Sequence, residues 1–492
     1  MLKSIISISL LLLLTACNEE SSKPKNNPQA TQNETYNQNN DNNSSLINEP
    51  LNNQDNQEEI ALAQSVAISE TQYFRVLSPK SCEQNEKNRF IYQVMHDSYL
   101  WANEVPELDY SSHEYNGSQK MLNALKSSKD KFSFIIDAKT AQNFFEEGKN
   151  NDLGLGLIVV KLDETNFALV VRFVYPNSPA YKQGVKRGDI IKFVENKTIS
   201  KETFDDVVNI LETQKTIKFS FLQDNNTVIQ KSITKKSYDI QTVLYSKMLI
   251  NRDKSKKVGY LVFQDFIHNA NQELDNIFQI FKRNSVNELV LDLRYNGGGV
   301  INVANHLASL IGGVNSSEHI FNQIHFNETY SQFNEISYFE KAQTNALNLN
   351  RVFVITTEAT CSSSELVINA LKASANNIEV IQIGEKTCGK PYGYMGSGHF
   401  CDKALYAINI ESKNGDGVGG YVDGLTPTCL AQDNYFKSFG DTTEDSLAEA
   451  LNYITYNRCS SKSTSTKLQK ATQQTSTLKL PQDGFKRIMN AY

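Results

Sequence analysis

The sequence lacks several features that mark common classes of protein. None of its seven cysteines forms a Cys-x-x-Cys pair, and none of its seven histidines forms a His-Glu-x-x-His motif, so no zinc site is indicated. Basic residues (49) do not outnumber acidic ones (55), and the net charge of −6 argues against nucleic acid as a partner. After the N-terminal segment, no stretch is apolar enough to cross a bilayer. We therefore expect no metal, no cofactor and no transmembrane helix.

The N-terminus has the pattern of an export signal. Lys3 precedes an apolar run from Ile5 to Leu14, which is too short to span a membrane comfortably. The run ends in Leu-Thr-Ala-Cys at Cys17, which resembles a bacterial lipobox. The resemblance implies cleavage before Cys17 and lipidation of its sulfur; the alternative is an ordinary signal peptide with a chance cysteine. We expect an exported protein, lipid-anchored to a bacterial membrane and facing the periplasm, with 1–17 as its signal peptide.

Composition divides the rest of the chain into five segments. Residues 18–75 are rich in Asn, Gln and Ser and poor in aromatic residues, so they predict a disordered tether. Residues 460–492 predict a low-complexity tail, in which 484–492 has the pattern of a short helix. Between the two lie an N-terminal helical domain (76–148), a β-rich domain (149–238) and an α/β domain (239–459). The predicted fold class is α/β with several domains.

Periodicity gives individual elements within these domains. Apolar residues at helical spacing lie in two stretches of the helical domain, one with Phe90, Val94, Tyr99 and Leu100 and one with Met121, Leu122 and Leu125. In the β-rich domain, Asp224–Asn226 separates strands predicted at 217–222 and 227–233, as a hairpin turn would. The last domain alternates predicted strands and helices, which favours a buried parallel sheet. Its strands are 258–263, 288–293, 352–356 and 378–383, and its helices are 300–311 and 363–373.

One motif order in the β-rich domain is specific. A glycine-apolar segment, Leu153-Gly154-Leu155-Gly156-Leu157, is followed by Ser-Pro-Ala at 178–180 and by Gly-Val-Lys-Arg-Gly-Asp-Ile-Ile at 184–191. This order resembles a PDZ domain of the bacterial protease type. The glycines would let backbone N–H groups bind a peptide carboxylate while the next strand pairs with the peptide. The alternative is that Gly154 and Gly156 merely form a tight turn.

Three polar loops follow predicted strands of the last domain. They are Arg294-Tyr-Asn-Gly-Gly-Gly299, Thr360-Cys-Ser-Ser-Ser-Glu365 and Gly384-Glu-Lys-Thr-Cys-Gly-Lys390. The carboxyl ends of strands in α/β sheets gather reactive groups at one edge. We therefore expect these three loops to meet.

Together the three loops resemble the motifs of the C-terminal processing, or tail-specific, serine peptidases, and the match spans roughly residues 80–459. The resemblance implies a crotonase-like α/β peptidase domain with Ser362 as the nucleophile and Lys390 as the general base. It also implies an oxyanion hole formed by the N–H groups of Ser363 and Gly298. The expected function is that of a serine endopeptidase acting on exported polypeptides with flexible C-termini, whose tails the PDZ-like domain would recognise. The sequence does not indicate an oligomeric state.

The chemistry of a Ser–Lys pair sets conditions that the residues must meet. A lysine acts as a base only when neutral, so its pKa must be lowered by desolvation or by nearby positive charge. No histidine is close to the three motifs in sequence, which weakens a Ser-His-Asp interpretation. Several relatives in the family that the motifs resemble carry a glutamine four residues after the lysine, where this chain has Tyr394. The partner that orients Lys390 is thus either Tyr394 or another group.

Simpler interpretations of the same residues stay open. Ser362-x-x-Glu365 is also a helix capping box, Ser364 is an alternative nucleophile, and Lys390 would be a solvated loop residue if no site forms. Gly384-x4-Gly-Lys resembles a phosphate-binding loop, but the next residue is Pro391, which has no hydroxyl to bind Mg²⁺. The alternative function is a non-catalytic, peptide-binding scaffold lipoprotein with a peptidase-like fold.

The six cysteines after Cys17 permit disulfides, because an exported protein meets an oxidising environment. Six cysteines allow 15 full pairings, which sequence alone does not distinguish. We predict Cys401–Cys429, which flank a strand-rich segment, and Cys82–Cys459, which bracket the folded region. Cys361 and Cys388 flank the predicted nucleophile and base, and a bond between them would draw these two loops together.

Overall fold

The computed structural model describes residues 76–163, 165–251, 253–396, 398–461 and 478–481. The predicted signal peptide with Cys17, the tether (18–75) and the terminal helix (484–492) lie outside these residues. The chain divides into two units, Met1–Glu58 and Glu59–Tyr492, and the described residues all belong to the second. None of the described helices has both the length and the apolar character needed to span a bilayer.

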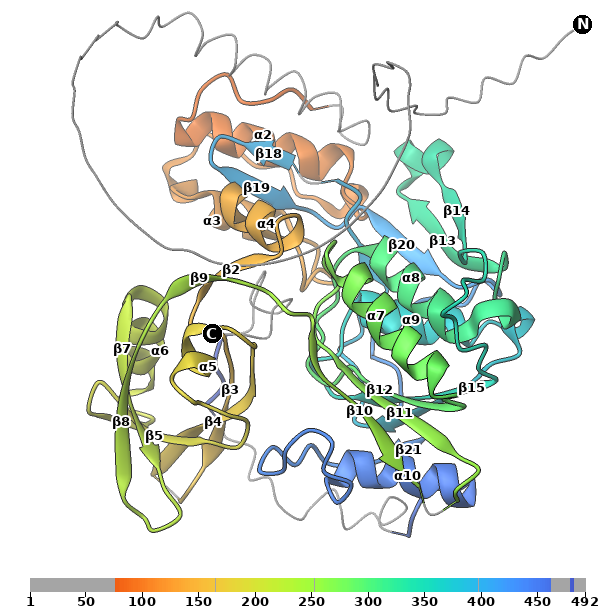
Figure 1. Ribbon diagram of the computed structural model, residues 1–492. Helices are drawn as coiled ribbons and strands as arrows, with labels where there is room; N and C mark the ends of the chain where they lie inside the picture. Colours follow the sequence, from red (N-terminus) through yellow and green to blue (C-terminus); the bar gives the residue numbers. More distant parts are fainter. Residues whose placement is uncertain (1–75, 164, 252, 397, 462–477, 482–492) are drawn as a thin grey trace, which may run out of the picture. The chain divides into compact units, whose positions relative to one another are not determined.

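A six-stranded sheet forms the centre of the C-terminal region (Figure 1). Its strand order is β10 (Val243–Ile250), β11 (Lys257–Phe263), β12 (Glu288–Asp292), β15 (Arg351–Thr356), β16 (Glu379–Gly384) and β21 (Cys429–Leu430). All neighbours from β11 to β21 pair in parallel, and only β10 is antiparallel. The four strands predicted for this region and their parallel arrangement are confirmed.

Helices cover both faces of this sheet, because successive strand residues point to opposite sides. Leu261 and Phe263 of β11 pack in the cluster with α7 (Ala270–Arg283), α8 (Ile301–Gly312) and α9 (Ser363–Leu371). Tyr260 and Val262 face the opposite cluster, which contains α10 (Asp445–Tyr456). In Figure 1, α7, α8 and α9 lie above the sheet and α10 below it. The helices predicted at 300–311 and 363–373 are α8 and α9.

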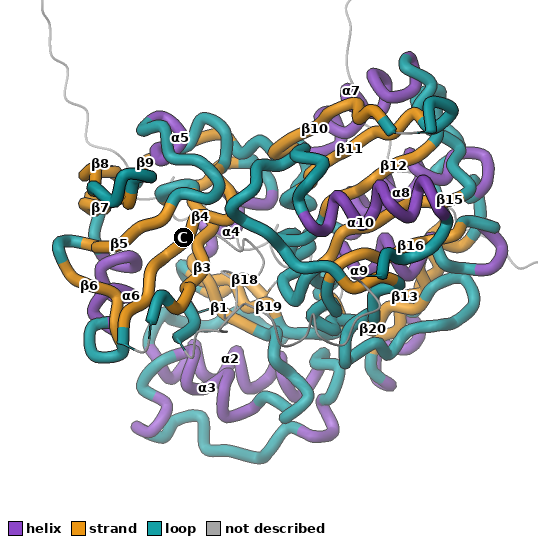
Figure 2. The backbone as a smooth tube through the Cα atoms, turned by 90° about the horizontal axis from the view of Figure 1, so that it is seen from below, coloured by secondary structure: helices purple, strands orange, loops and turns teal. Residues whose placement is uncertain are grey.

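The β-rich region folds as a separate module with its own core (Figure 2). Its six strands have the order β3 (Leu155–Lys161), β4 (Asn166–Val174), β6 (Lys197–Ser200), β5 (Ile190–Val194), β7 (Thr216–Leu222) and β8 (Val228–Thr234). Two helices, α5 (Pro179–Lys182) and α6 (Phe204–Thr213), complete it. The predicted hairpin is β7–β8, and β3 lies at an edge of the sheet. We call this unit the strand-rich module; its likeness to a PDZ domain stays a prediction.

The N-terminal region contains the expected helices, α2 (Gln84–Asp97) and α3 (Ser118–Leu125), and also α4 (Ala138–Phe145). It is not purely helical, because β1 (Phe134–Asp137) pairs with β19 (Lys403–Tyr406), which pairs with β18 (Gly398–Phe400). Strands from late in the chain therefore complete this layer. A second pairing, between β2 (Lys149–Asp152) and β9 (Lys236–Asp239), joins the two ends of the strand-rich module.

A smaller sheet and five short turns of 3-10 helix complete the described elements. The sheet has the order β14 (Glu335–Tyr338), β13 (Ile320–Phe326), β20 (Ile410–Lys413) and β17 (Tyr392–Gly393). The 3-10 turns are Ala102–Glu104, His113–Tyr115, Gly313–Asn315, Glu328–Phe333 and Ser374–Asn376.

The structure corrects both predicted disulfides. Its bonds are Cys82–Cys401, Cys429–Cys459 and Cys361–Cys388. Cys401 follows β18, and the pairing of β18 and β19 with β1 brings it to the N-terminal layer rather than to Cys429. Cys459, three residues after α10, reaches Cys429 in β21 because α10 packs on that side of the sheet.

Candidate active site

The three loops singled out in the sequence meet at the carboxyl edge of the central sheet. Gly298 follows β12, Ser362 lies between β15 and α9, and Lys390 follows β16, and these three strands are neighbours. Ser362, Ser363 and Lys390 line one cavity of about 390 Å³, together with Gly297 and Gly299. The predicted nucleophile and base therefore face the same space.

The backbone at Ser362 is held in an unusual conformation. Its φ is 56°, in the left-handed region that non-glycine residues rarely adopt, and α9 begins at the next residue. The N–H of Ser363 is at the first position of the helix, where no intrahelical acceptor exists. Gly298 approaches so closely that a Cβ there would lie 2.7 Å from the Cβ of Ser362 and 3.0 Å from the nitrogen of Ser363. Only glycine fits beside the nucleophile at this position.

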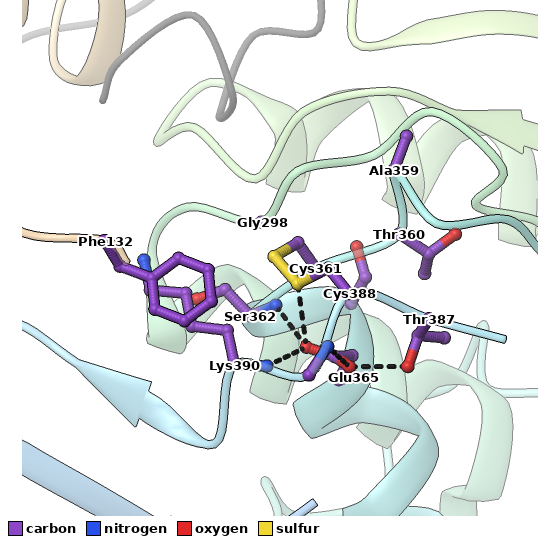
Figure 3. Close-up of a disulfide and its surroundings, with 12 residues drawn as sticks. Phe132, Gly298, Ala359, Thr360, Cys361, Ser362, Glu365, Thr387, Cys388 and Lys390 are labelled. Carbon is purple, nitrogen blue, oxygen red and sulfur yellow. Dashed lines mark hydrogen bonds between the residues drawn. A yellow bond between two sulfur atoms is a disulfide. The ribbon is translucent and has the colours of Figure 1, made fainter. Parts of the chain in front are cut away.

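A buried carboxylate ties the serine loop to the lysine loop. Oε2 of Glu365 accepts hydrogen bonds from the backbone N–H groups of Ser362 and Lys390, both at 2.9 Å (Figure 3). Oε1 accepts from the hydroxyl of Thr387 at 2.5 Å and from the N–H of Gly389 at 2.8 Å. Burial raises the pKa of Glu365, and the four hydrogen bonds oppose that effect. The capping-box pattern in the sequence thus belongs to a larger clamp that joins both loops.

A disulfide joins the same two loops. Cys361 directly precedes Ser362, and Cys388 lies two residues before Lys390. The N–H of Cys388 also donates to the carbonyl of Thr360 at 3.0 Å. Figure 3 shows the bond next to Ser362 and Glu365. The serine and lysine loops are therefore fixed to each other by one covalent bond and by the Glu365 clamp.

Lys390 is buried, with 4% of its surface exposed, and an aromatic residue orients its amine. Nζ donates to the hydroxyl of Tyr394 at 2.9 Å, and this hydroxyl donates to the carbonyl of Phe132 at 2.6 Å. Nζ also lies 5.3 Å from the centre of the Phe132 ring. Of the two alternatives for the orienting partner, this contact favours Tyr394. Phe132, from the N-terminal region, is a contact that the sequence motifs did not indicate.

The structure separates the two candidate serines. Ser364 is fully buried, and its hydroxyl donates to the carbonyl of Asn296 at 2.9 Å. Ser362 lines the cavity and Ser364 is not among the lining residues. The arrangement favours Ser362 as the nucleophile.

One of the two predicted oxyanion donors already has an acceptor. The N–H of Gly298 donates to Oδ1 of Asn296 at 2.9 Å. Asn296 is itself buried, and its side-chain amide donates to the carbonyl of Phe263 at 3.1 Å. An oxyanion that used the Gly298 N–H would have to compete with the Asn296 side chain.

The cavity has mostly apolar and aromatic walls, together with a histidine that the motifs did not indicate. His268, in the loop between β11 and α7, lines the cavity although it is distant from the three motifs in sequence. Its backbone N–H donates to the carbonyl of Phe145 at 3.2 Å. The aromatic and aliphatic lining residues are Phe145, Val300, Ile301, Leu366, Tyr392, Tyr394, Met395, Tyr406 and Tyr421.

A buried ionic network connects the strand-rich module to the loop before the glycines. Nη2 of Arg187, in the module, lies 2.7 Å from Asp433, which also pairs with Arg294 at 2.8 Å. Although burial acts in the opposite direction, the two guanidinium groups hold the pKa of Asp433 well below its usual range. Arg187 also donates to the hydroxyl of Tyr295, adjacent to Asn296.

The predicted peptide-binding residues lie at the start of edge strand β3, and all five are buried. Gly154 has a φ of 76°, and a Cβ there would lie 2.1 Å from the Cβ of Ser178. Its N–H donates to Oδ1 of Asp152 at 2.7 Å. A carboxylate that bound this N–H would therefore have to displace Asp152.

Comparison with known proteins finds matches to one peptidase family. The model for peptidase family S41 matches residues 257–396, and that for the S41 N-terminal domain matches residues 86–134. A "probable CtpA-like serine protease" of Staphylococcus aureus (strain N315) is 22% identical over 305 residues, which cover 61% of this chain and 55% of that protein. One from Staphylococcus epidermidis (strain ATCC 12228) is also 22% identical, with 62% and 57% covered. The match thus spans little more than half the length of these relatives.

The fold has a counterpart among solved structures. The crystal structure titled "Putative S41 protease" from Bacteroides fragilis superimposes with a TM-score of 0.61 at 24% identity, covering 74% of this chain and 96% of that one. Both matched sequence regions contribute to the surroundings of Lys390: Phe132 comes from the first, and Ser362 and Lys390 come from the second. The two matched regions are therefore peptidase S41 family domains, of the kind found in C-terminal processing serine peptidases.

Proposed function

We propose that the chain is a serine endopeptidase in which Ser362 is the nucleophile and Lys390 the general base. The observation that carries the proposal is the shared cavity, since both side chains line it and their loops are joined by Glu365 and by Cys361–Cys388. A lysine base needs the neutral form of its amine, and Lys390 is buried, as that role requires.

The proposed reaction follows from this arrangement. Lys390 takes the hydroxyl proton of Ser362 as Oγ attacks the carbonyl carbon of the peptide bond. The N–H of Ser363 stabilises the resulting oxyanion. The N–H of Gly298 also contributes once its hydrogen bond to Oδ1 of Asn296 has broken. Lys390 then gives the proton to the leaving amine as the C–N bond breaks. Water attacks the acyl-serine ester by the same proton path and releases the new carboxyl terminus.

Tyr394 has a positioning role in this proposal. Because its hydroxyl donates to the carbonyl of Phe132, its oxygen is left to accept a hydrogen bond from Lys390. The contact holds Nζ by one of its N–H groups, and in the proposed reaction the lone pair of the neutral amine takes the proton of Ser362. A tyrosine thus serves where relatives use glutamine.

The proposed substrates are exported polypeptides with flexible C-termini. The apolar and aromatic walls of the cavity suit an apolar side chain next to the scissile bond. Export, lipidation at Cys17 and a periplasmic location complete the proposal, based on the signal pattern in the sequence. We further propose that the strand-rich module, through its PDZ-like features, binds the substrate segment.

Labelling with a fluorophosphonate tests the assembled site independently of the substrate. The purified chain is expected to be labelled and to cleave unfolded casein, whereas Ser362→Ala removes both activities and Lys390→Ala reduces both at least a hundredfold. Lys386→Ala is the matched control, because this lysine is exposed in the same loop. Absence of labelling in the wild-type chain across a wide pH range would instead support the non-catalytic scaffold.

A further inference from the structure

A short segment near the C-terminus packs on the strand-rich module. Leu480 is 6% exposed and belongs to the core cluster of the module, and Leu478 packs against the same cluster. Lys479 between them is exposed, and Pro481 is partly buried. Burial at alternate positions is the pattern of an extended segment that lies with one face on an apolar surface.

The core cluster that this segment joins includes residues of an edge strand and of a helix. The core cluster includes Leu155, Leu157 and Val159 of β3 and Val207 and Leu211 of α6. β3 is at the edge of the sheet, where a further extended chain can be added. An edge strand beside an apolar helix face is a surface that recognises peptides by alternate side chains.

We propose that Leu478–Pro481 is a tethered ligand of the strand-rich module, occupying the surface that a substrate segment would bind. The surface then prefers an extended peptide with apolar residues two apart, such as the Leu-Lys-Leu of this segment. The consequence for catalysis rests on the proposed peptidase function: a substrate must displace the segment before the module can hold it.

The position of the segment also bears on what the module recognises. Pro481 is followed by further residues, so the segment packs through side chains such as those of Leu478 and Leu480 and not through a terminal carboxylate. This agrees with the N–H of Gly154, which already donates to Asp152. Internal stretches of a polypeptide are therefore suitable ligands as well as chain ends.

A binding experiment tests the tether without relying on catalysis. All proteins carry Ser362→Ala. The probe is a fluorescent peptide with the sequence of residues 475–482, and its binding is measured by fluorescence anisotropy. The full chain with Leu478→Asp and Leu480→Asp should bind the peptide more tightly than the chain with the unmodified segment does. A tethered ligand has an effective concentration of roughly millimolar, so relief of competition should tighten binding by about tenfold to a hundredfold.

Two controls define the outcome. Lys479→Asp introduces the same residue at the exposed position and should bind the peptide as weakly as the unmodified chain. A peptide with Asp in place of both leucines should bind none of the proteins. Equal affinity of the unmodified chain and the double variant, or no binding to either, would overturn the proposal.

Cleavage assays then separate this proposal from the proposed function. With Ser362 intact, the double variant should show a lower KM for a peptide containing the Leu-x-Leu pattern and an unchanged kcat. If the chain fails to cleave any substrate but the anisotropy result holds, the tethered ligand stands and the peptidase proposal fails. If cleavage occurs and anisotropy shows no competition, the peptidase proposal stands and the tethered ligand fails.

Discussion

Glu365→Gln is the substitution that most directly tests how the site is held together. The two oxygens of Glu365 accept four hydrogen bonds, two each, and three of the four donors are backbone N–H groups. A glutamine of the same shape places an NH₂ group where one oxygen was. One orientation keeps the glutamine oxygen as the acceptor for the N–H groups of Ser362 and Lys390. The hydroxyl of Thr387 can then rotate to accept from the NH₂ group. The N–H of Gly389, however, faces another donor and loses its acceptor.

The expected cost follows from that geometry. An unsatisfied buried donor costs about 1–3 kcal/mol, and the remaining bonds lose the strength that a charged acceptor gives. We expect the free energy of unfolding to fall by about 2–4 kcal/mol. Since a shift of about 1 Å in a reacting group can reduce the rate by roughly a hundredfold, we expect kcat to fall by about that factor.

Glu273→Gln provides a matched control for this experiment. Glu273 lies in the first turn of α7, and its two oxygens accept from the N–H groups of Thr242 and Val243 at 3.1 and 3.0 Å. Chemical denaturation and fluorophosphonate labelling of Ser362 are measured on both variants. Glu273→Gln should lower stability and leave the labelling rate intact. A Glu365→Gln variant that labels as fast as wild type would refute the role of the clamp in positioning Ser362 and Lys390.

Two further predictions use matched pairs of variants. Tyr394→Phe should lower kcat by about tenfold to a hundredfold with little change in KM, because the amine of Lys390 loses a hydrogen-bond partner worth about 1–3 kcal/mol. Tyr392→Phe, in the same cavity, is its control, and steady-state kinetics that changed equally in both would contradict the positioning role. Replacing Cys361 and Cys388 by alanine should cost about 3 kcal/mol of stability and also slow labelling of Ser362, since both active loops are released. The Cys429–Cys459 bond closes a loop of similar length, with a sequence separation of 30 against 27, so its removal should cost similar stability and leave labelling unchanged.

The parallel sheet and the position of the site were predictable because both depend on local patterns. Buried strands such as β12 have continuous apolar runs, and the loops that follow them carry the polar motifs. Parallel neighbours place those loops at one edge, so Ser362 and Lys390 could be assigned to a common site. Helices α7 and α10 were missed, although Leu274, Phe278 and Phe281 of α7 have the spacing of a buried helix face.

The parts that the sequence did not reveal depend on contacts between distant segments. Cys82 pairs with Cys401 only because β1 and β19 join the two ends of the described fold. Glu365 was recognised as a capping residue, but three of its donors lie in the lysine loop, which no local pattern connects to α9. Phe132 reaches the lysine in the same way, through the N-terminal layer.

A buried carboxyl group outside the active site predicts how stability depends on pH. Asp265 is fully buried after β11, and Oδ2 accepts from the hydroxyl of Tyr175 in the strand-rich module at 2.6 Å. Burial raises the pKa of Asp265 to about 8, and the charges of Glu273 and Asp152 add to the effect. In the unfolded chain the pKa of an aspartate is about 3.9, so folding takes up a proton between these two values.

The sign of the effect follows from that proton uptake. A carboxyl group whose pKa is raised by folding stabilises the protein fully below pH about 4, and this contribution is lost as the pH rises toward 8. The slope approaches about 1.4 kcal/mol per pH unit within that window. In Asp265→Asn the group cannot ionise, so the difference in unfolding free energy between variant and wild type should grow in favour of the variant from pH 5 to pH 8. Urea denaturation at several pH values measures this difference, in which the other titrating groups largely cancel. Parallel curves for the two proteins would show that Asp265 is charged in the folded state throughout, and the contact with Tyr175 would then be an ionic one.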